Sequence, residues 1–191
     1  MDRILITAFE PFGSASRNAS AEVLRLLPDK IGGTAVRKML LPVIFGKAAE
    51  AVLSRKADAV FLLGEAGGRT MVTPEKKAEN LRNARIPDNE GNQPKGEKIL
   101  PDGPEELHAR IPVDRLVQQM QDEGYSVSVS EDAGAFVCND TFYLVASGSP
   151  VPVEFIHCPA RPENAADYAP VVERFIALAL SEIRLINEAA R

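Results

Sequence analysis

The stretch RILITAFEPFGSASRNASAEVLRLLPDKIGGTAVRKMLLPV, residues 3–43, decides the fold class. Residues 3–9 form a short, continuous run of apolar and β-branched side chains, which is typical of a buried strand. Residues 18–27 follow with capping residues and helical spacing, and Pro28 ends that helix. Residues 35–43 have the composition of a second strand. This order of strand, helix and strand, with continuously apolar strands, indicates a sheet that is covered on both faces.

The same alternation continues along the chain, apart from one central segment. We expect further helices at 45–56, 113–124, 136–147 and 165–190, and further strands at 57–64, 125–130 and 151–159. Residues 65–106 are rich in Gly, Pro, Asn and Asp and are too long for a simple connection, which is typical of a functional or disordered loop. Because no linker or internal repeat is visible, we expect residues 1–191 to form a single three-layer α/β/α domain with a twisted, mostly parallel mixed sheet.

Composition excludes several classes of partner. The chain carries 22 Lys and Arg against 27 Asp and Glu, a formal net charge of −5. Nucleic acid is therefore not expected as a partner, because phosphate binding needs a basic excess. No apolar run approaches the roughly 20 residues of a membrane helix, and the N-terminus lacks a signal-peptide cleavage pattern. We expect a cytoplasmic protein whose two cysteines are free. With two histidines and no Cys/His cluster of zinc spacing, no metal site is expected.

The motif AGAFVCND, residues 133–140, contains one of the two cysteines, Cys138. It lies one turn into the helix expected at 136–147. A helix N-terminus carries about half a positive charge, which favours the reactive thiolate. Free cysteines are also among the most buried residues, so an inert core thiol is the alternative. The residues alone leave both interpretations open.

A nucleophilic cysteine needs a base, usually histidine. His108 lies in a polar region and is interpreted as a solvated surface residue. His157 ends the strand expected at 151–159, and ligand sites in α/β sheets lie at the carboxyl ends of parallel strands. A hydrogen-bonded core histidine is the alternative. A third group normally orients the histidine. Glu75, within the long central segment, is a candidate, although taken alone it reads as a solvated charge.

Five motifs, taken together and in order, resemble the pyrrolidone-carboxylate peptidases, also called pyroglutamyl peptidase I. They are ILITAFEPFG (4–13), GEAGGRTMVTPEKKAEN (64–80), ARIPDNEGNQP (84–94), AGAFVCND (133–140) and EFIHCPARPE (154–163). The resemblance implies a phosphorylase/hydrolase-like α/β fold and a cysteine peptidase that removes an N-terminal pyroglutamyl residue from peptides. It implies Glu75, Cys138 and His157 as the catalytic residues, no cofactor, and a homotetramer.

The pyroglutamyl group is a neutral lactam, so its pocket should be apolar with a few hydrogen-bonding groups. By resemblance Phe9 and Phe12 line that pocket, and the further walls expected are Ile86, Phe136 and Val137. In the expected reaction His157 takes the thiol proton and Cys138 attacks the carbonyl, forming an acyl-enzyme that water hydrolyses. Glu75 holds the imidazole in the correct tautomer. Arg85 and backbone N–H groups at the start of the Cys138 helix stabilise the oxyanion.

Two departures from the family pattern bear on the site. Glu65 stands where the family typically carries an uncharged residue, and the segment between Cys138 and His157 is shorter than usual. A carboxylate at 65 either points to solvent, pairs with Arg69 or Arg85, or opposes thiolate formation at Cys138. Two other functions stay open: a redox sensor that uses Cys138 as its switch, and a relative on the same scaffold with a different acyl substrate.

Overall fold

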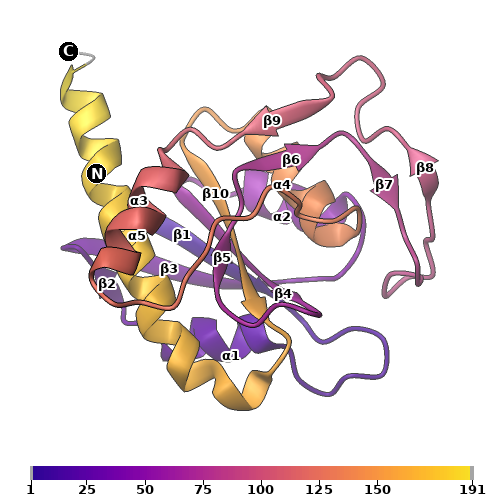
Figure 1. Ribbon diagram of the computed structural model, residues 1–191. Helices are drawn as coiled ribbons and strands as arrows, with labels where there is room; N and C mark the ends of the chain where they lie inside the picture. Colours follow the sequence, from indigo (N-terminus) through magenta and orange to yellow (C-terminus); the bar gives the residue numbers. More distant parts are fainter. Residues whose placement is uncertain (1, 190–191) are drawn as a thin grey trace.

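The fold is known from a computed structural model, which describes residues 2–189. A six-stranded sheet with the order β2–β3–β1–β4–β10–β5 runs through its centre (Figure 1). Strands β3, β1, β4 and β10 are parallel to one another, while β2 and β5 pair antiparallel at the two edges. The strands span Arg3–Phe9 (β1), Lys30–Ile31 (β2), Thr34–Leu41 (β3), Val60–Ala66 (β4), Thr73–Pro74 (β5) and Val153–Pro159 (β10). The expected mostly parallel, mixed sheet is confirmed.

Helices cover both faces of this sheet (Figure 1). They span Ala19–Leu26 (α1), Lys47–Leu53 (α2), Val113–Asp122 (α3), Val137–Gly148 (α4) and Ala165–Ala189 (α5), with a short 3-10 turn at Pro162–Asn164 (η1). Apolar side chains of α1, α3 and α5 share one core, and those of α2 and α4 share the other. The three-layer α/β/α architecture follows from these two cores.

Strand β1 shows why its sequence is continuously apolar. Its residues from Ile4 to Phe9 are all buried. Ile4 and Ile6 belong to the core under α1 and α5, whereas Leu5 and Phe9 belong to the core under α2 and α4. Because successive side chains of a strand point to opposite faces, burial on both faces removes the polar alternation of a half-exposed strand.

Helix α1 begins where the capping pattern predicts it. The side chain of Asn18 accepts a hydrogen bond from the Ser20 N–H at 2.9 Å, which satisfies one of the free donors of the first turn. The helix ends at Leu26, directly before Leu27 and Pro28, because proline disfavours helical backbone at the residue before it.

The central segment at 65–106 is ordered and not an irregular loop. Two small antiparallel pairs form within it: Lys77–Glu79 (β6) with Glu106–His108 (β9), and Arg82–Asn83 (β7) with Lys95–Glu97 (β8). Figure 1 shows these pairs as an arm beside α4. Strands of two or three residues are too short to produce a readable period of hydrophobicity, so the sequence pattern does not reveal them.

The strand expected at 125–130 does not form. That segment makes only isolated parallel bridges, Val72 with Val127 and Glu75 with Ser130. The segment has the alternating hydrophobicity of a strand, but β5, the edge strand beside which it lies, is only two residues long. An edge this short offers too few backbone groups for a further ladder.

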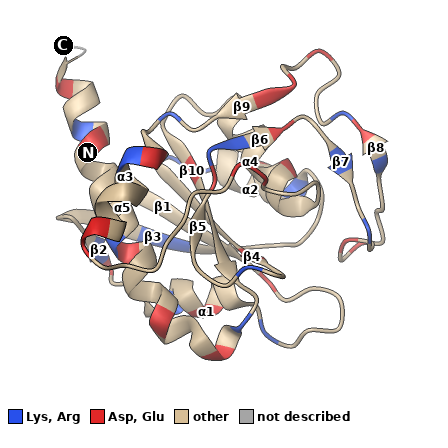
Figure 2. Cartoon of the chain, in the orientation of Figure 1, with Lys and Arg blue, Asp and Glu red and all other residues tan. Residues whose placement is uncertain are grey.

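Charged residues of both signs are interspersed over the molecule. Figure 2 shows Asp and Glu among Lys and Arg on the helices and on the β6–β9 arm, and the face in view has no uniformly basic area. No helix within residues 2–189 is long and apolar enough to cross a membrane.

One buried side chain conflicts with its apolar surroundings. Glu154 in β10 is 2% exposed, and within residues 2–189 neither of its carboxyl oxygens has a hydrogen-bond partner. Burial raises the pKa of Glu154 well above its ordinary value, and the charge of Glu75 raises it further. The fold therefore favours the protonated, uncharged form of Glu154.

This raised pKa predicts a specific pH dependence of stability. The contribution of Glu154 is fully present below its unfolded-state pKa and is lost as the pH rises towards the folded-state value. Glu154→Gln should therefore melt at a higher temperature than the parent at pH 8 and at nearly the same temperature at pH 4. Between the unfolded-state and folded-state pKa values, each pH unit changes the free energy of unfolding by up to about 1.4 kcal/mol. Thermal unfolding across pH measures the difference, with exposed Glu173→Gln as the control. A difference that stays constant with pH would contradict the prediction.

Candidate active site

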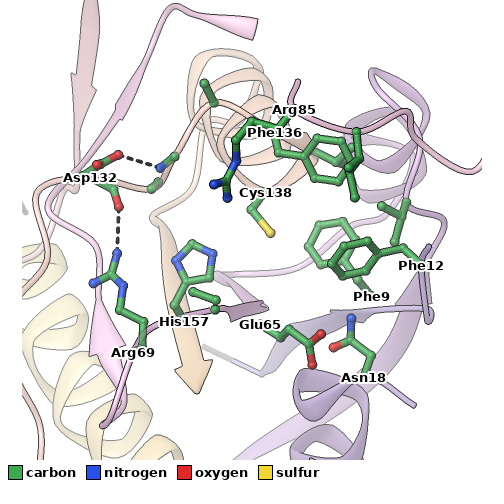
Figure 3. A pocket seen from close by; sticks show the side chains of 18 of the residues that line it. Phe9, Phe12, Asn18, Glu65, Arg69, Arg85, Asp132, Phe136, Cys138 and His157 are labelled. Carbon is green, nitrogen blue, oxygen red and sulfur yellow. Dashed lines mark hydrogen bonds between the residues drawn. The ribbon is translucent and has the colours of Figure 1, made fainter. Parts of the chain in front are cut away.

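A cavity of about 500 Å³ opens at the carboxyl ends of β1, β4 and β10, beside the N-terminus of α4. This is the edge of the sheet at which the sequence pattern places ligand binding. Most of the residues predicted for the site line this cavity (Figure 3): Phe9, Phe12, Arg85, Ile86, Phe136, Val137, Cys138 and His157. Glu75 lies behind His157, outside the cavity.

Cys138 is the second residue of α4 and lies half-buried over β4. The packing beneath it is very close: a Cβ added to Gly64 would lie 2.9 Å from the Cys138 Sγ and 2.8 Å from the Phe155 ring. Gly64 pairs in register with His157 on the neighbouring parallel strand. Paired residues of parallel strands project to the same face, so this packing places the sulfur next to the imidazole, as Figure 3 shows.

His157 is 3% exposed, and its Nδ1 lies 2.7 Å from the Oε1 of Glu75, which is completely buried. Since the carboxylate accepts, Nδ1 carries the proton in this hydrogen bond. The tautomer then leaves Nε2 unprotonated, as the ring nitrogen able to take a proton. Glu75 is therefore not a solvated charge. His157 is buried and hydrogen-bonded, and it also lines the cavity.

The acid is paired with a residue that the sequence pattern did not single out as its partner. Arg69, in the turn after β4, lies with Nη2 3.3 Å from the Oε1 of Glu75. The same nitrogen donates to the Asp132 carbonyl at 2.8 Å, and Nη1 donates to the Thr73 Oγ1 at 3.2 Å. No local pattern marks this arginine: two of its acceptors, Thr73 and Glu75, meet it through an irregular turn, and the third, Asp132, comes from a distant segment of the chain.

The thiol of Cys138 is neutral at rest. Burial raises its pKa to about 12, with further increases from the charges of Glu75 and Glu65. The helix N-terminus, which favours thiolate in isolation, is thus opposed by burial and two carboxylates. A nucleophile with this pKa needs a base that removes its proton as it attacks, and His157 is placed to do so.

The wall opposite Arg69 is aromatic. Phe12 and Phe136 have ring centroids 5.9 Å apart, and Phe45 meets Phe136 edge-on at 5.4 Å. Phe9 is 2% exposed and packs under this group against Phe155 at 6.4 Å. Rigid, tilted ring pairs of this kind form a shaped apolar surface that suits a small flat group.

Polar groups complete the cavity. Arg85 is exposed at the mouth, and Figure 3 shows its guanidinium reaching towards Cys138 and His157. Ile86, at 45% exposure, extends the apolar wall to the rim. The first N–H groups of α4 have no intrahelical acceptor, and the side chain of its N-cap residue, Phe136, does not cap them. These donors and Arg85 lie beside the sulfur, where an oxyanion would form.

Glu65 lines the same cavity, and its Oε2 accepts a hydrogen bond from the Ala19 N–H at 2.6 Å. The carboxylate therefore helps to cap α1, where a negative charge is stabilised by the helix dipole. Asn18, the N-cap residue of α1, lies next to Glu65 in Figure 3 and also lines the cavity. Within residues 2–189, no group of His, Cys, Asp and Glu is arranged to hold a metal ion.

Comparisons with known proteins identify the family. The family model described as pyroglutamyl peptidase matches residues 2–182. The pyrrolidone-carboxylate peptidase of Staphylococcus saprophyticus is 40% identical over 174 residues, covering 86% of this chain and 82% of that protein. The crystal structure of the Thermus thermophilus pyrrolidone carboxyl peptidase superposes with a TM-score of 0.83 at 37% identity, covering 94% of this chain and 99% of that chain.

Pyroglutamyl peptidase I of Bacillus amyloliquefaciens is also similar, with a TM-score of 0.87 at 33% identity, covering 96% of this chain and 98% of that chain. The resemblance seen in the sequence motifs is thereby confirmed. The α/β fold is shared with these solved structures.

The position of Glu65 predicts a measurable effect on the thiol. Because Glu65 raises the pKa of Cys138, Glu65→Gln should lower that pKa while keeping an oxygen to accept from Ala19. Iodoacetamide should then label Cys138 faster near neutral pH, since more of the thiol is ionised. Cys158 is fully buried and should not react in the folded protein. Labelling rates across pH, with Glu173→Gln as the control, test this. If the labelling curves of Glu65→Gln and the parent superimposed, Glu65 would have no effect on the pKa of Cys138, which would contradict the prediction.

Proposed function

The chain belongs to the pyroglutamyl peptidase family of cysteine peptidases, and we propose that its cavity removes N-terminal pyroglutamyl residues from peptides by attack of Cys138. The observation that carries this proposal is the alignment of Glu75, His157 and Cys138 beside an aromatic wall. Glu75 is hydrogen-bonded to His157 at 2.7 Å, and Cys138 packs on Gly64, the register partner of His157. The three residues therefore stand in the order acid, base and nucleophile.

In the proposed reaction, the Nε2 of His157 takes the thiol proton as the sulfur attacks the pyroglutamyl carbonyl carbon. Glu75 stabilises the imidazolium that forms. The tetrahedral oxyanion lies against the N–H groups of the first turn of α4 and the guanidinium of Arg85, where each donor contributes about 3–4 kcal/mol. His157 then returns the proton to the leaving amine. Water, activated by the same imidazole, hydrolyses the thioester and frees the thiol.

The aromatic part of the cavity fits the proposed acyl group. A lactam ring is flat and uncharged, so Phe9, Phe12 and Phe136 can bury its faces without an ionic partner. Val137 and Ile86 are the further walls of this proposed subsite. An amine-terminal substrate would instead bring an ammonium group into an apolar pocket, which costs desolvation free energy.

A redox-sensing role for Cys138 has less support. Sensor cysteines need a low pKa and good exposure, because the thiolate is the form that oxidants attack. Burial and the two neighbouring carboxylates have the opposite effect on Cys138.

We further propose that the chain forms one catalytic domain, acts in the cytoplasm and assembles as a homotetramer. Two free thiols support a reducing compartment. Leu185 and Ile186 lie near the end of α5 at 58% and 48% exposure, and apolar side chains exposed together support a contact between copies. The mixed surface charge and the net charge of −5 support peptides, and neither nucleic acid nor membranes, as binding partners.

The two cysteines predict a matched pair of variants. Cys138→Ala should lower kcat/KM for a chromogenic pyroglutamyl amide by at least about 10³-fold, because the nucleophile is lost. Cys158→Ala should keep most of the activity, since that side chain belongs to the core under α1 and α5. Initial rates, with melting temperatures to confirm folding, decide the assignment. Equal losses in both variants would contradict it.

The lactam carbonyl predicts the substrate preference. Prolyl amides have the same ring without this carbonyl, so a site that hydrogen-bonds it leaves a buried donor unpaired when proline binds. We expect kcat/KM for the prolyl amide to be at least about 10³-fold lower. Parallel rate measurements on the two amides test this preference. Comparable rates would mean that the cavity recognises only ring shape, and turnover of neither amide would point to a different acyl substrate.

A further inference from the structure

Arg69 joins two parts of the site: the nearby segment that carries Thr73 and Glu75, and the turn at Asp132, which is 63 residues away in the sequence. Its guanidinium lies 3.3 Å from the Oε1 of Glu75, 2.8 Å from the Asp132 carbonyl and 3.2 Å from the Thr73 hydroxyl. Its side chain is 26% exposed and lies at the cavity wall beside His157 in Figure 3. A planar fork with several donors can satisfy all three acceptors at once, which a lysine ammonium at the end of a flexible stem does less well.

Glu75 depends on this contact. Its Oε1 is shared by the Nδ1 of His157 and the guanidinium of Arg69, and its Oε2 has no hydrogen-bond partner within residues 2–189. The carboxylate is 0% exposed, so water does not compensate its charge. Burying a carboxylate costs free energy unless it is paired and hydrogen-bonded. The ion pair with Arg69 supplies that pairing, and it directs Oε1 to the side where His157 lies.

The contact with Asp132 reaches the nucleophile. Asp132 lies in the turn that leads from the bridge at Ser130 into α4, and its side chain accepts from the Gly134 N–H at 2.8 Å. Figure 3 shows the hydrogen bond between Arg69 and Asp132 at the wall of the cavity. One guanidinium therefore fixes the backbone that leads to Cys138 relative to the acid that orients His157.

We propose that Arg69 is a positioning residue of the peptidase reaction, which holds the Glu75 carboxylate aimed at His157 and anchors the turn that leads to Cys138. This inference rests on the proposed function of the cavity. Arg69 acts through Glu75 and the turn, and it is not assigned a contact with the reacting atoms. The other titratable groups that surround the histidine and the thiol are Glu65, Arg85, Asp132 and Glu154.

A double-mutant cycle with Glu75 separates positioning from general stability. Arg69→Gln should lower kcat roughly 10- to 100-fold, the usual effect of losing a partner that orients a functional side chain. In a Glu75→Gln background the same change should cost less than about threefold, because residues that act as a unit are not additive. Arg110→Gln removes a guanidinium that also bonds backbone carbonyls, at the opposite end of α4, and should leave kcat unchanged.

A second measurement needs no substrate. Glu75 raises the pKa of the Cys138 thiol, and the cation of Arg69 opposes that charge. In Arg69→Gln a side-chain amide can still donate to Glu75, and so can His157, but the cation that opposes the charge of Glu75 is gone. The thiol pKa should therefore rise, and the iodoacetamide labelling profile should move to higher pH. Arg69→Lys keeps the charge but loses the fork, so its labelling profile should stay near that of the parent while its kcat falls. If the chain hydrolysed no pyroglutamyl amide, the proposed function would fail, and the labelling profiles would still decide the role of Arg69.

Three results would overturn the proposal. One is an equal loss of kcat on Arg69→Gln in the parent and in Glu75→Gln, which is the behaviour of a residue that only stabilises the fold. Another is a labelling profile of Arg69→Gln that superimposes on the parent profile. The last is an Arg69→Lys variant with the parent kcat, which would show that the three-way bridge has no function.

Discussion

The close packing of α4 on Gly64 is the constraint on which the rest of the site depends. Any side chain at position 64 would overlap the Phe155 ring and the Cys138 sulfur, so the helix approaches the sheet only because this residue is glycine. Gly64 is also the register partner of His157. The contact that seats the helix therefore brings nucleophile and base together on two regular elements. A site held on rigid elements keeps its geometry better than one carried by loops.

Electrostatic balance is the second theme of the site. Burial, Glu75 and Glu65 all raise the pKa of the Cys138 thiol, while Arg69 counters the charge of Glu75. The resting state is then a neutral thiol beside an imidazole whose tautomer Glu75 selects, and the proton moves only when the carbonyl is attacked. Glu154 lies in the same sheet and differs from Glu75 in having no cation beside it. Its pKa is raised well above the ordinary value, which favours the protonated form.

The residues that follow the nucleophile order the arm that completes the cavity. The side chain of Asn139 accepts from the Glu79 N–H at 2.8 Å and donates to the carbonyls of Glu79 and Leu81. Asp140 accepts from Arg82 at 2.6 Å and from the Gly46 N–H at 2.8 Å. Both are completely buried. The first turn of α4 thus carries the nucleophile and also holds the segment that leads to Arg85 and Ile86 at the cavity mouth.

The sequence by itself determined the layers, the strands and helices with strong periodicity, and the family, because burial on both faces and helix caps leave local patterns and because motifs such as AGAFVCND are specific. It also pointed to Glu75, Cys138 and His157, although the residues alone left inert alternatives open. Only the tertiary structure decided the pairing of Arg69 with Glu75, the ordered arm at 65–106 and the state of the thiol. The arm depends on contacts between segments far apart in the chain, and the state of the thiol depends on burial. Arg69 and Glu75 are close in the sequence, but the irregular turn that pairs them has no periodic signal.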